Sequence, residues 1–212
     1  MMMMQLLGLL LLGGGCCLAQ TPQPCTCPPL MSGQMTVSTQ NEALWASAKF
    51  FYDSVGQRYR LQQTGIMKNK TFTMDVLLLF KEHTVYTIDE AKRTCIKSFL
   101  KDSFHPMEIP KDSTLLGQVV VGSSSTPGEG LLVNTWTGEF TGGVKFMATV
   151  TEFGCIPVNA VYHTPNYGWL VHSYFNNVKG IQDPGKLIPP PYCPTAEVEI
   201  GQKPVDFFSL FL

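Results

Sequence analysis

Short stretches of alternating apolar and polar residues recur along the chain, separated by turn-forming residues. Residues 146–151 read Phe-Met-Ala-Thr-Val-Thr and residues 59–62 read Tyr-Arg-Leu-Gln. A period of two places successive side chains on opposite faces of a β-strand. β-Branched and aromatic residues fill these stretches, and Gly, Pro, Asn, Asp or Ser separates most of them at spacings of about ten residues. The predicted strands are 45–52, 57–63, 73–80, 84–88, 95–100, 116–121, 131–136, 145–153, 158–163 and 169–175.

This pattern is typical of a mostly antiparallel all-β fold with little helix. No helical period continues beyond two or three turns, and all 15 prolines follow residue 20 and interrupt long helices. The loop-like segments 122–130 and 183–194 do not differ enough in composition to mark a domain boundary. We therefore expect one domain over residues 20–212. Its apolar end, residues 206–212, is too short to span a bilayer, and we expect it to pack onto the domain or into a dimer interface.

The N-terminus has the features of an export signal. Residues 1–19 carry no charged side chain and contain the apolar run 6–12, and Cys17-Leu18-Ala19 places small residues around a cleavage site after Ala19. A transmembrane anchor is the alternative, but it needs about 20 apolar residues. The glycines at 13–15 and the polar Gln20 end the run too early. We expect a cleaved signal peptide over 1–19 and a secreted or lysosomal protein.

Cleavage leaves an odd set of cysteines: Cys25, Cys27, Cys95, Cys155 and Cys193. An oxidising compartment predicts two disulfides and one remaining thiol, either free or bonded to another chain. Metal binding by Cys25-x-Cys27 is the alternative, and it suits a reducing compartment better. The sequence Asn69-Lys70-Thr71 is a glycosylation sequon, so we expect a glycan at Asn69 in a surface loop.

Composition narrows the function. The chain is 44% hydrophobic and only 15% charged, whereas an average soluble domain has about 25% charged residues. The hydrophobic content excludes intrinsic disorder. The net charge of −1 gives no electrostatic case for nucleic-acid binding. The shortage of charge indicates an apolar surface that is concealed in a cavity, under the C-terminal end or against a partner.

Motifs for catalysis are absent from the sequence. None of the 4 histidines has metalloenzyme spacing, and the serines at 123–125 lie in no nucleophile elbow. We therefore expect a protein that is not an enzyme, with an unrecognised hydrolase as the weakest alternative. His163 and His172 flank residues 164–168. Because histidine gains charge between pH 8 and 5, acidification would favour an anionic ligand there. The plainer interpretation is two partly exposed residues at strand ends.

Several short segments follow one another in the order typical of a known family. They are 25–30 (Cys-Thr-Cys-Pro-Pro-Leu) with Gly33, 85–89 (Val-Tyr-Thr-Ile-Asp), 92–95 (Lys-Arg-Thr-Cys), 105–110 (His-Pro-Met-Glu-Ile-Pro), 112–114 (Asp-Ser-Thr), 152–158 (Glu-Phe-Gly-Cys-Ile-Pro-Val) and 181–184 (Ile-Gln-Asp-Pro) before Cys193. Together they resemble the ependymin and ependymin-related proteins over essentially the whole mature chain.

The resemblance implies a secreted, disulfide-bonded glycoprotein that is commonly a homodimer. It implies two curved antiparallel sheets enclosing a hydrophobic pocket, similar to the bacterial lipoprotein carriers. It also implies the disulfides Cys25–Cys155 and Cys95–Cys193, which leaves Cys27 unpaired. Asp112 stands where many relatives have a sequon Asn, so Asn69 is the remaining glycan site.

Apolar residues on the predicted strands are candidates to line such a pocket, with ordinary core packing as the alternative for each. A register slip of one residue exchanges the two faces of a strand. The candidates are Leu77, Leu79, Tyr86, Ile88, Val119, Val121, Val133, Phe146, Ala148, Val150, Val161, Trp169, Val171 and Phe175.

We therefore expect a secreted or lysosomal glycoprotein that binds lipids or other hydrophobic ligands without catalysis, with no membrane span and with a second copy as partner. The alternative is a calcium-binding extracellular matrix or cell-adhesion glycoprotein. Calcium is the one cofactor the resemblance suggests, and it takes six to eight oxygen ligands. No spacing selects its ligands, and ordinary surface charge is the simpler interpretation of the available carboxylates Asp89, Glu90, Glu152 and Asp183.

Overall fold

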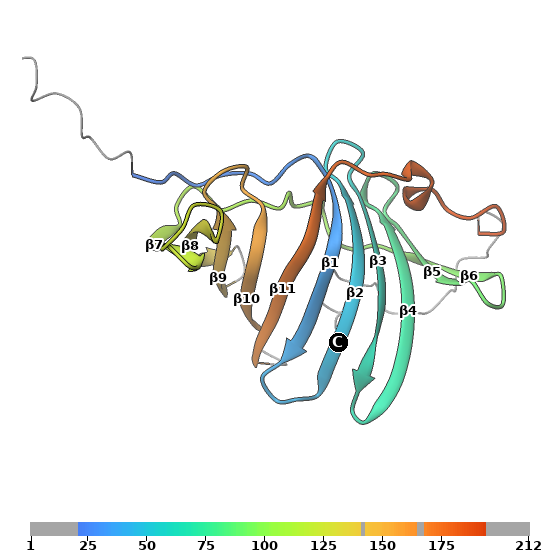
Figure 1. The fold of residues 1–212 in the computed structure, drawn as a ribbon. Coiled ribbons are helices and arrows are strands. Elements are labelled where there is room, and N and C mark those ends of the chain that lie inside the picture. The colour runs from blue at the N-terminus through green and yellow to red at the C-terminus, as the bar shows by residue number, and fades with distance from the viewer. Residues whose placement is uncertain (1–20, 141–142, 165–167, 194–212) are drawn as a thin grey trace, which may run out of the picture.

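The computed structural model describes residues 21–140, 143–164 and 168–193, and their strands form one antiparallel sheet. The sheet has 11 strands in the order β6-β5-β4-β3-β2-β1-β11-β10-β9-β8-β7 (Figure 1). The elements are β1 (Leu30–Thr39), β2 (Leu44–Asp53), β3 (Arg58–Met67), β4 (Lys70–Leu79), the 3₁₀ helix η1 (Phe80–Glu82), β5 (Thr84–Asp89), β6 (Thr94–Phe99), β7 (Thr114–Gly122), β8 (Gly130–Phe140), β9 (Val144–Thr151), β10 (Pro157–Thr164), β11 (Gly168–Lys179) and the 3₁₀ helix η2 (Pro184–Leu187).

The all-β, antiparallel fold expected from the sequence is confirmed, and every predicted strand is present. Two details differ. The strands form one continuous sheet instead of two, because β1 pairs with β2 on one side and with β11 on the other. β1 itself is not among the predicted strands, since Ser32, Gly33, Gln34 and Ser38 make it polar for a strand. This missed strand is the one that joins the two halves of the sheet.

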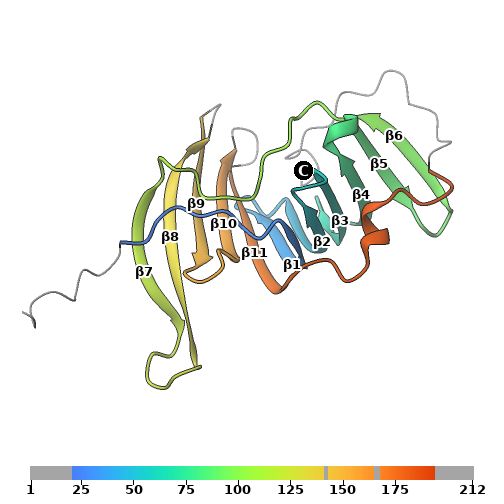
Figure 2. The same cartoon turned by 90° about the horizontal axis from the view of Figure 1, so that it is seen from above.

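The sheet is strongly bent, and the strands of the described residues do not close into a barrel, so β6 and β7 are its edge strands (Figure 2). Met35, Phe50, Leu61 and Leu170 form one cluster with Cys27 and Ile109. The segments that contain Cys27 and Ile109 run along the concave side of the sheet in Figure 2. We call this side the inner face and the opposite side the outer face. Side chains alternate between the faces along each strand. The register therefore assigns every strand residue to one face.

Two irregular segments, 21–29 and 100–113, run beside each other across the inner face (Figure 2). The Cys27 amide donates to the Met107 carbonyl at 2.9 Å, and the Ile109 amide donates to the Cys25 carbonyl at 2.8 Å. The disulfide Cys25–Cys155, with its Cα atoms 6.0 Å apart, ties this pair to the β9–β10 turn. These segments cover one end of the inner face.

A C-terminal strap, residues 181–193, lies on the outer face of β3 to β6 (Figures 1 and 2). Leu187 and Cys193 pack there against Leu77, Leu79, Tyr86 and Ile88. The disulfide Cys95–Cys193 fixes its end, and the Arg58 and Arg60 guanidinium groups donate to the carbonyls of Leu187 (3.3 Å) and Lys186 (3.1 Å). Both disulfides are those that the family resemblance implied, and Cys27 is unpaired and buried.

The predicted signal peptide, 1–19, and the apolar end, 206–212, lie outside the described residues. Within the described ranges, no helix has the length and apolar character needed to cross a bilayer.

Candidate ligand-binding face

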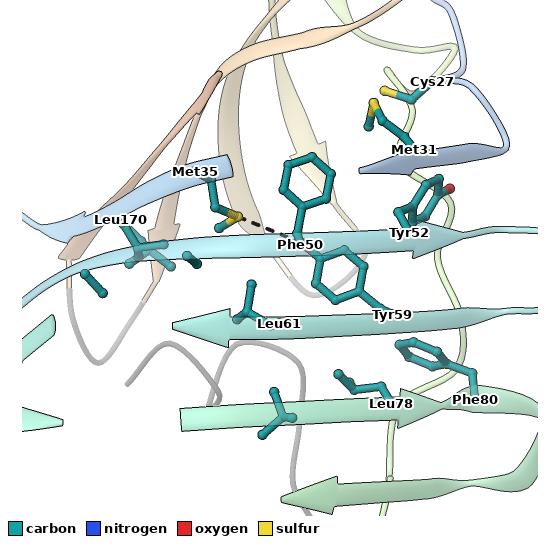
Figure 3. Packing of buried hydrophobic residues seen from close by; sticks show 14 of the residues in the cluster. Cys27, Met31, Met35, Phe50, Tyr52, Tyr59, Leu61, Leu78, Phe80 and Leu170 are labelled. Atoms are coloured by element: carbon teal, nitrogen blue, oxygen red, sulfur yellow. Dashed lines mark hydrogen bonds between the residues drawn. The ribbon is translucent and has the colours of Figure 1, made fainter. Parts of the chain in front are cut away.

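The inner face is a continuous apolar surface built from alternate residues of neighbouring strands. Phe50 stacks on Tyr59 with ring centroids 6.3 Å apart and meets the edge of Tyr174 at 5.7 Å. Met35 lies beside them and accepts a hydrogen bond from the Tyr59 hydroxyl at 3.9 Å (Figure 3). In Figure 3 the labelled side chains of β2, β3 and β4 gather on the same side of the sheet, where Leu61 joins the aromatic rings.

A glycine in β1 makes room for this aromatic cluster. A Cβ atom at Gly33 would lie 2.9 Å from the Phe50 ring and 2.5 Å from the Asn177 side chain. The register of β1 against β11 shifts at the same place, between Ser32 and Gln34. Such a bulge bends the strand locally. Gly33 therefore allows the sheet to curve while Phe50 stays on the inner face.

Methionines give the inner face adaptable surface. Met31 and Met35 are fully buried within the cluster, and Met67 and Met74 are half-buried at its margin. Unbranched thioether side chains fill irregular gaps and are frequent on surfaces that accept varied ligands. The margin formed by Met67, Phe72 and Met74 lies on β3 and β4.

A few polar groups lie among the apolar residues. Burial lowers the pKa of His172 to about 3 and raises the pKa of Tyr162 to about 12. The Tyr174 hydroxyl and His172 Nδ1 are 3.5 Å apart. All three groups are uncharged at neutral pH. Apolar sites commonly combine a large hydrophobic surface with a small number of such orienting polar groups.

The predicted pocket residues do not share one face. Phe146, Ala148 and Val150 on β9 lie on the inner face, where Ala148 is opposite Trp136 and Val150 opposite Asn134. The other candidates fall on the outer face by their register, so the candidates are divided between the two faces of the sheet. They are Leu77, Leu79, Tyr86, Ile88, Val119, Val121, Val133, Val161, Trp169, Val171 and Phe175.

The sequence does not separate the two sets of candidates, for a physical reason. Residues 76–80 are continuously apolar because β4 is covered on both sides, by the inner cluster and by the C-terminal strap. With no alternation, the sequence cannot indicate which residues face inward. Residues that the prediction missed, such as Met35, Phe50 and Leu170, belong to strands where the alternation is visible. In β1, the spacing of Met31, Met35 and Val37 was the available signal.

A separate hollow of about 1040 Å³ lies against β1 to β6. Most of its lining residues have polar side chains, and the register places Gln34, Lys49, Gln62 and Asp75 among them on the outer face. The lining also includes the charged residues Asp89, Glu90 and Lys92, and an apolar ligand bound beside these groups would have to displace their water. The apolar inner face, not this hollow, is therefore the candidate site for one.

Each of the carboxylates considered for calcium has another partner. Asp89 pairs with Lys92 at 3.1 Å, Glu90 pairs with Arg60 at 3.2 Å, and Asp183 accepts from the Gly185 amide at 3.0 Å. Glu152 accepts from the side chains of Asn134 and Gln118. Among the described residues, no three histidine, cysteine or acidic side chains are grouped to hold a metal ion.

The two histidines of the pH hypothesis lie on opposite faces. His163 is exposed on the outer face, where its ring lies 5.0 Å from that of Trp169. His172 is buried on the inner face, and its pKa of about 3 keeps it neutral between pH 8 and 5. The expected gain of charge at both residues is therefore wrong for His172.

The sequon and the unpaired cysteine have contrasting positions. Asn69 is exposed in the two-residue turn between β3 and β4, as expected of a glycan acceptor. Cys27 is buried, and burial raises the pKa of its thiol to about 12. A buried, protonated thiol is a poor partner for an intermolecular disulfide.

Fold and disulfides together define a disulfide-bonded all-β protein with one open antiparallel sheet and an apolar inner face. The family model described as Ependymin matches residues 68–193. Ependymin-2 of Carassius auratus is 35% identical over 89% of this chain and 88% of its own length, and ependymin of Notemigonus crysoleucas has the same identity and coverage. Mammalian ependymin-related protein 1 of Mus musculus is 30% identical over 84% of this chain and 80% of its own length.

The chain belongs to the ependymin family, and membership implies a secreted glycoprotein. An uncharacterized conserved protein from Thermus thermophilus has a similar fold, with a TM-score of 0.50 and 13% sequence identity. The match covers 84% of this chain and 91% of that protein. At this identity the likeness concerns the fold alone.

Proposed function

We propose that the protein binds apolar molecules, lipids foremost, on the inner face of its sheet and carries them without chemical change. The observation that carries the proposal is the continuous apolar inner face of an unclosed sheet. Burying apolar surface contributes about 25 cal/mol per Å², so a lipid chain gains free energy in proportion to the area that it covers on the half-buried side chains at the margin of this face. Met67, Phe72 and Met74, half-buried at its margin, are the side chains that an entering ligand would meet first.

The test compares two methionines on opposite faces. Met74 is half-buried at the margin of the inner face, and Met147 is exposed on the outer face. The protein, secreted from eukaryotic cells and stripped of lipid, is titrated with a fluorescent fatty acid. Met74→Lys should weaken binding about tenfold or more, because a charge in an apolar site is costly to desolvate. Met147→Lys should leave the affinity unchanged.

Thermal melts of both variants establish that they are folded. Equal affinities of folded Met74→Lys and the wild-type protein for the fatty acid would contradict binding on the inner face. Native mass spectrometry of the unstripped protein should show bound masses that lipid extraction removes.

A homodimer is a further part of the proposal, and the edge strand β7 supports it. Val119 and Val121 on β7, and Leu131 opposite Val121 on β8, expose apolar side chains on the outer face. An unpaired edge with apolar side chains favours association with another strand. In light scattering, Val119→Lys/Val121→Lys should reduce a dimeric mass to that of a monomer. A wild-type mass that is already monomeric would contradict the dimer.

A further inference from the structure

Two large apolar side chains stand exposed on the outer face beside the β3–β4 hairpin. Trp45 has 57% of its surface exposed and Ile66 has 45%. The register places Trp45 opposite Ile66, and Ile66 opposite Thr71. The three residues therefore form one row across β2, β3 and β4, on one face. Adjacent exposed apolar side chains form a patch that gains free energy when another group covers it.

The sequon lies at the end of the same row. Lys68 and Asn69 form the two-residue turn, with φ of 47° and 63°, and Met67 pairs with Lys70 across it. Positive φ at both central residues is the geometry of a tight hairpin turn, for which Asn is well suited. Asn69 and Thr71 are exposed. Thr71 supplies the hydroxyl of the sequon and is also the first side chain of the row.

We propose that the N-glycan on Asn69 folds back over this row, so that its first two sugars cover Ile66 and Trp45. Neighbouring strands lie about 4.8 Å apart, which places Trp45 about 10 Å across the sheet from Thr71. The core disaccharide of an N-glycan is long enough to follow that path. The C–H face of an N-acetylglucosamine ring packs on an aromatic face, where the ring quadrupole is negative.

A second exposed tryptophan provides the internal control. Trp169, 36% exposed, also lies on the outer face, but on β11. The strands β2 and β1 separate β11 from the β3–β4 hairpin. Its indole contacts His163, with ring centroids 5.0 Å apart. A glycan that follows the Thr71 row does not reach it.

The experiment uses the secreted glycoprotein and two ways of removing sugar. An endoglycosidase trims the glycan to one sugar, and Thr71→Val abolishes the sequon while it keeps Asn69 in the turn. Thr71→Val is preferable to a change at Asn69 because that residue has positive φ. Loss of glycan should lower the Tm of the wild-type protein by about 2–4 °C. It should have no effect in Trp45→Ala or Ile66→Thr, and the full effect in Trp169→Ala.

Fluorescence gives an independent measurement. In Trp169→Phe, the remaining tryptophans are Trp45 and the buried Trp136. Acrylamide quenching then reports on Trp45, and it should increase when the glycan is trimmed. Peptide mass spectrometry establishes whether Asn69 carries the glycan. An unoccupied Asn69, or an equal Tm shift in the wild-type and Trp45→Ala proteins, would overturn the proposal.

Discussion

The two faces of the sheet are stabilised by different kinds of interaction. The inner face is a cluster of aromatic, aliphatic and methionine side chains, whereas the outer face of β3 and β4 is organised around ions. There, Arg60 Nε and Nη2 donate to the two carboxylate oxygens of Asp75 at 2.8 and 2.6 Å, and Gln62 donates to Asp75 at 2.9 Å. The acidic partners Asp75 and Glu90 raise the pKa of Arg60, against the effect of burial. The inner face can adapt its shape, but the outer one is fixed by directional bonds.

Because the two faces are held by different interactions, the hydrophobic cluster on each face can have a different role. On the outer face, the ion pair and two carbonyls of the C-terminal strap hold Leu187 over the apolar residues of β4 and β5. A polar network with its partners in place specifies one arrangement. The described part of the inner face is built mainly from apolar and aromatic side chains, and such a surface suits a ligand of variable shape.

Arg60→Met breaks the outer network with the largest expected effect. Arg60 has only 3% of its side chain exposed, so its loss leaves the Asp75 carboxylate buried with one remaining Gln62 donor. We expect a loss of about 4 kcal/mol in the free energy of unfolding, measured by urea denaturation. The double variant Arg60→Met/Asp75→Leu should recover most of it. A loss below about 1 kcal/mol for the single variant would mean that the pair behaves as a surface ion pair.

Leu61→Ala and Leu77→Ala compare the two faces of the sheet with side chains of the same type and the same burial. Both side chains are fully buried, Leu61 on the inner face and Leu77 under the strap. Each variant should lose about 3 kcal/mol of stability through the cavity that it creates. Only Leu61→Ala should alter the affinity for the fluorescent fatty acid. Equal changes in affinity would show that stability, and not the face, controls binding.

Strand positions proved more predictable than strand faces. Alternation and turn residues were enough to find ten of the 11 strands, because backbone pairing depends on local properties. The side of Leu77 and Leu79 was not predictable, since it depends on Leu187 more than a hundred residues later. When a segment distant in the sequence covers a strand, the local sequence pattern does not indicate which face it covers.

The candidate site shows the same limit. Phe146, Ala148 and Val150 are predicted pocket residues on an alternating strand, and they lie on the inner face. The disulfides, implied by family resemblance, could not have been paired from spacing, since they join residues 130 and 98 positions apart. Likewise, no pattern separates the buried His172 from the exposed His163.

The pH dependence of stability distinguishes the two faces through His172 and His163. Folded His172 has a pKa of about 3 because burial disfavours its charged form, whereas its ordinary value is 6.5. Above pH 6.5 the residue is neutral in both states and has no effect. Between pH 6.5 and 3 the unfolded chain binds a proton that the folded chain does not, so stability falls as pH falls.

At pH 5 this difference amounts to about 2 kcal/mol. Urea denaturation at pH 7 and pH 5 should therefore show that His172→Leu loses about 2 kcal/mol less on acidification than the wild-type protein. His163→Leu, on the exposed outer side, should behave like the wild type. Identical pH dependence in His172→Leu and the wild type would show that His172 is protonated in the folded protein. Water would then reach His172 on the inner face, and this result would count against the proposal that the face binds an apolar ligand.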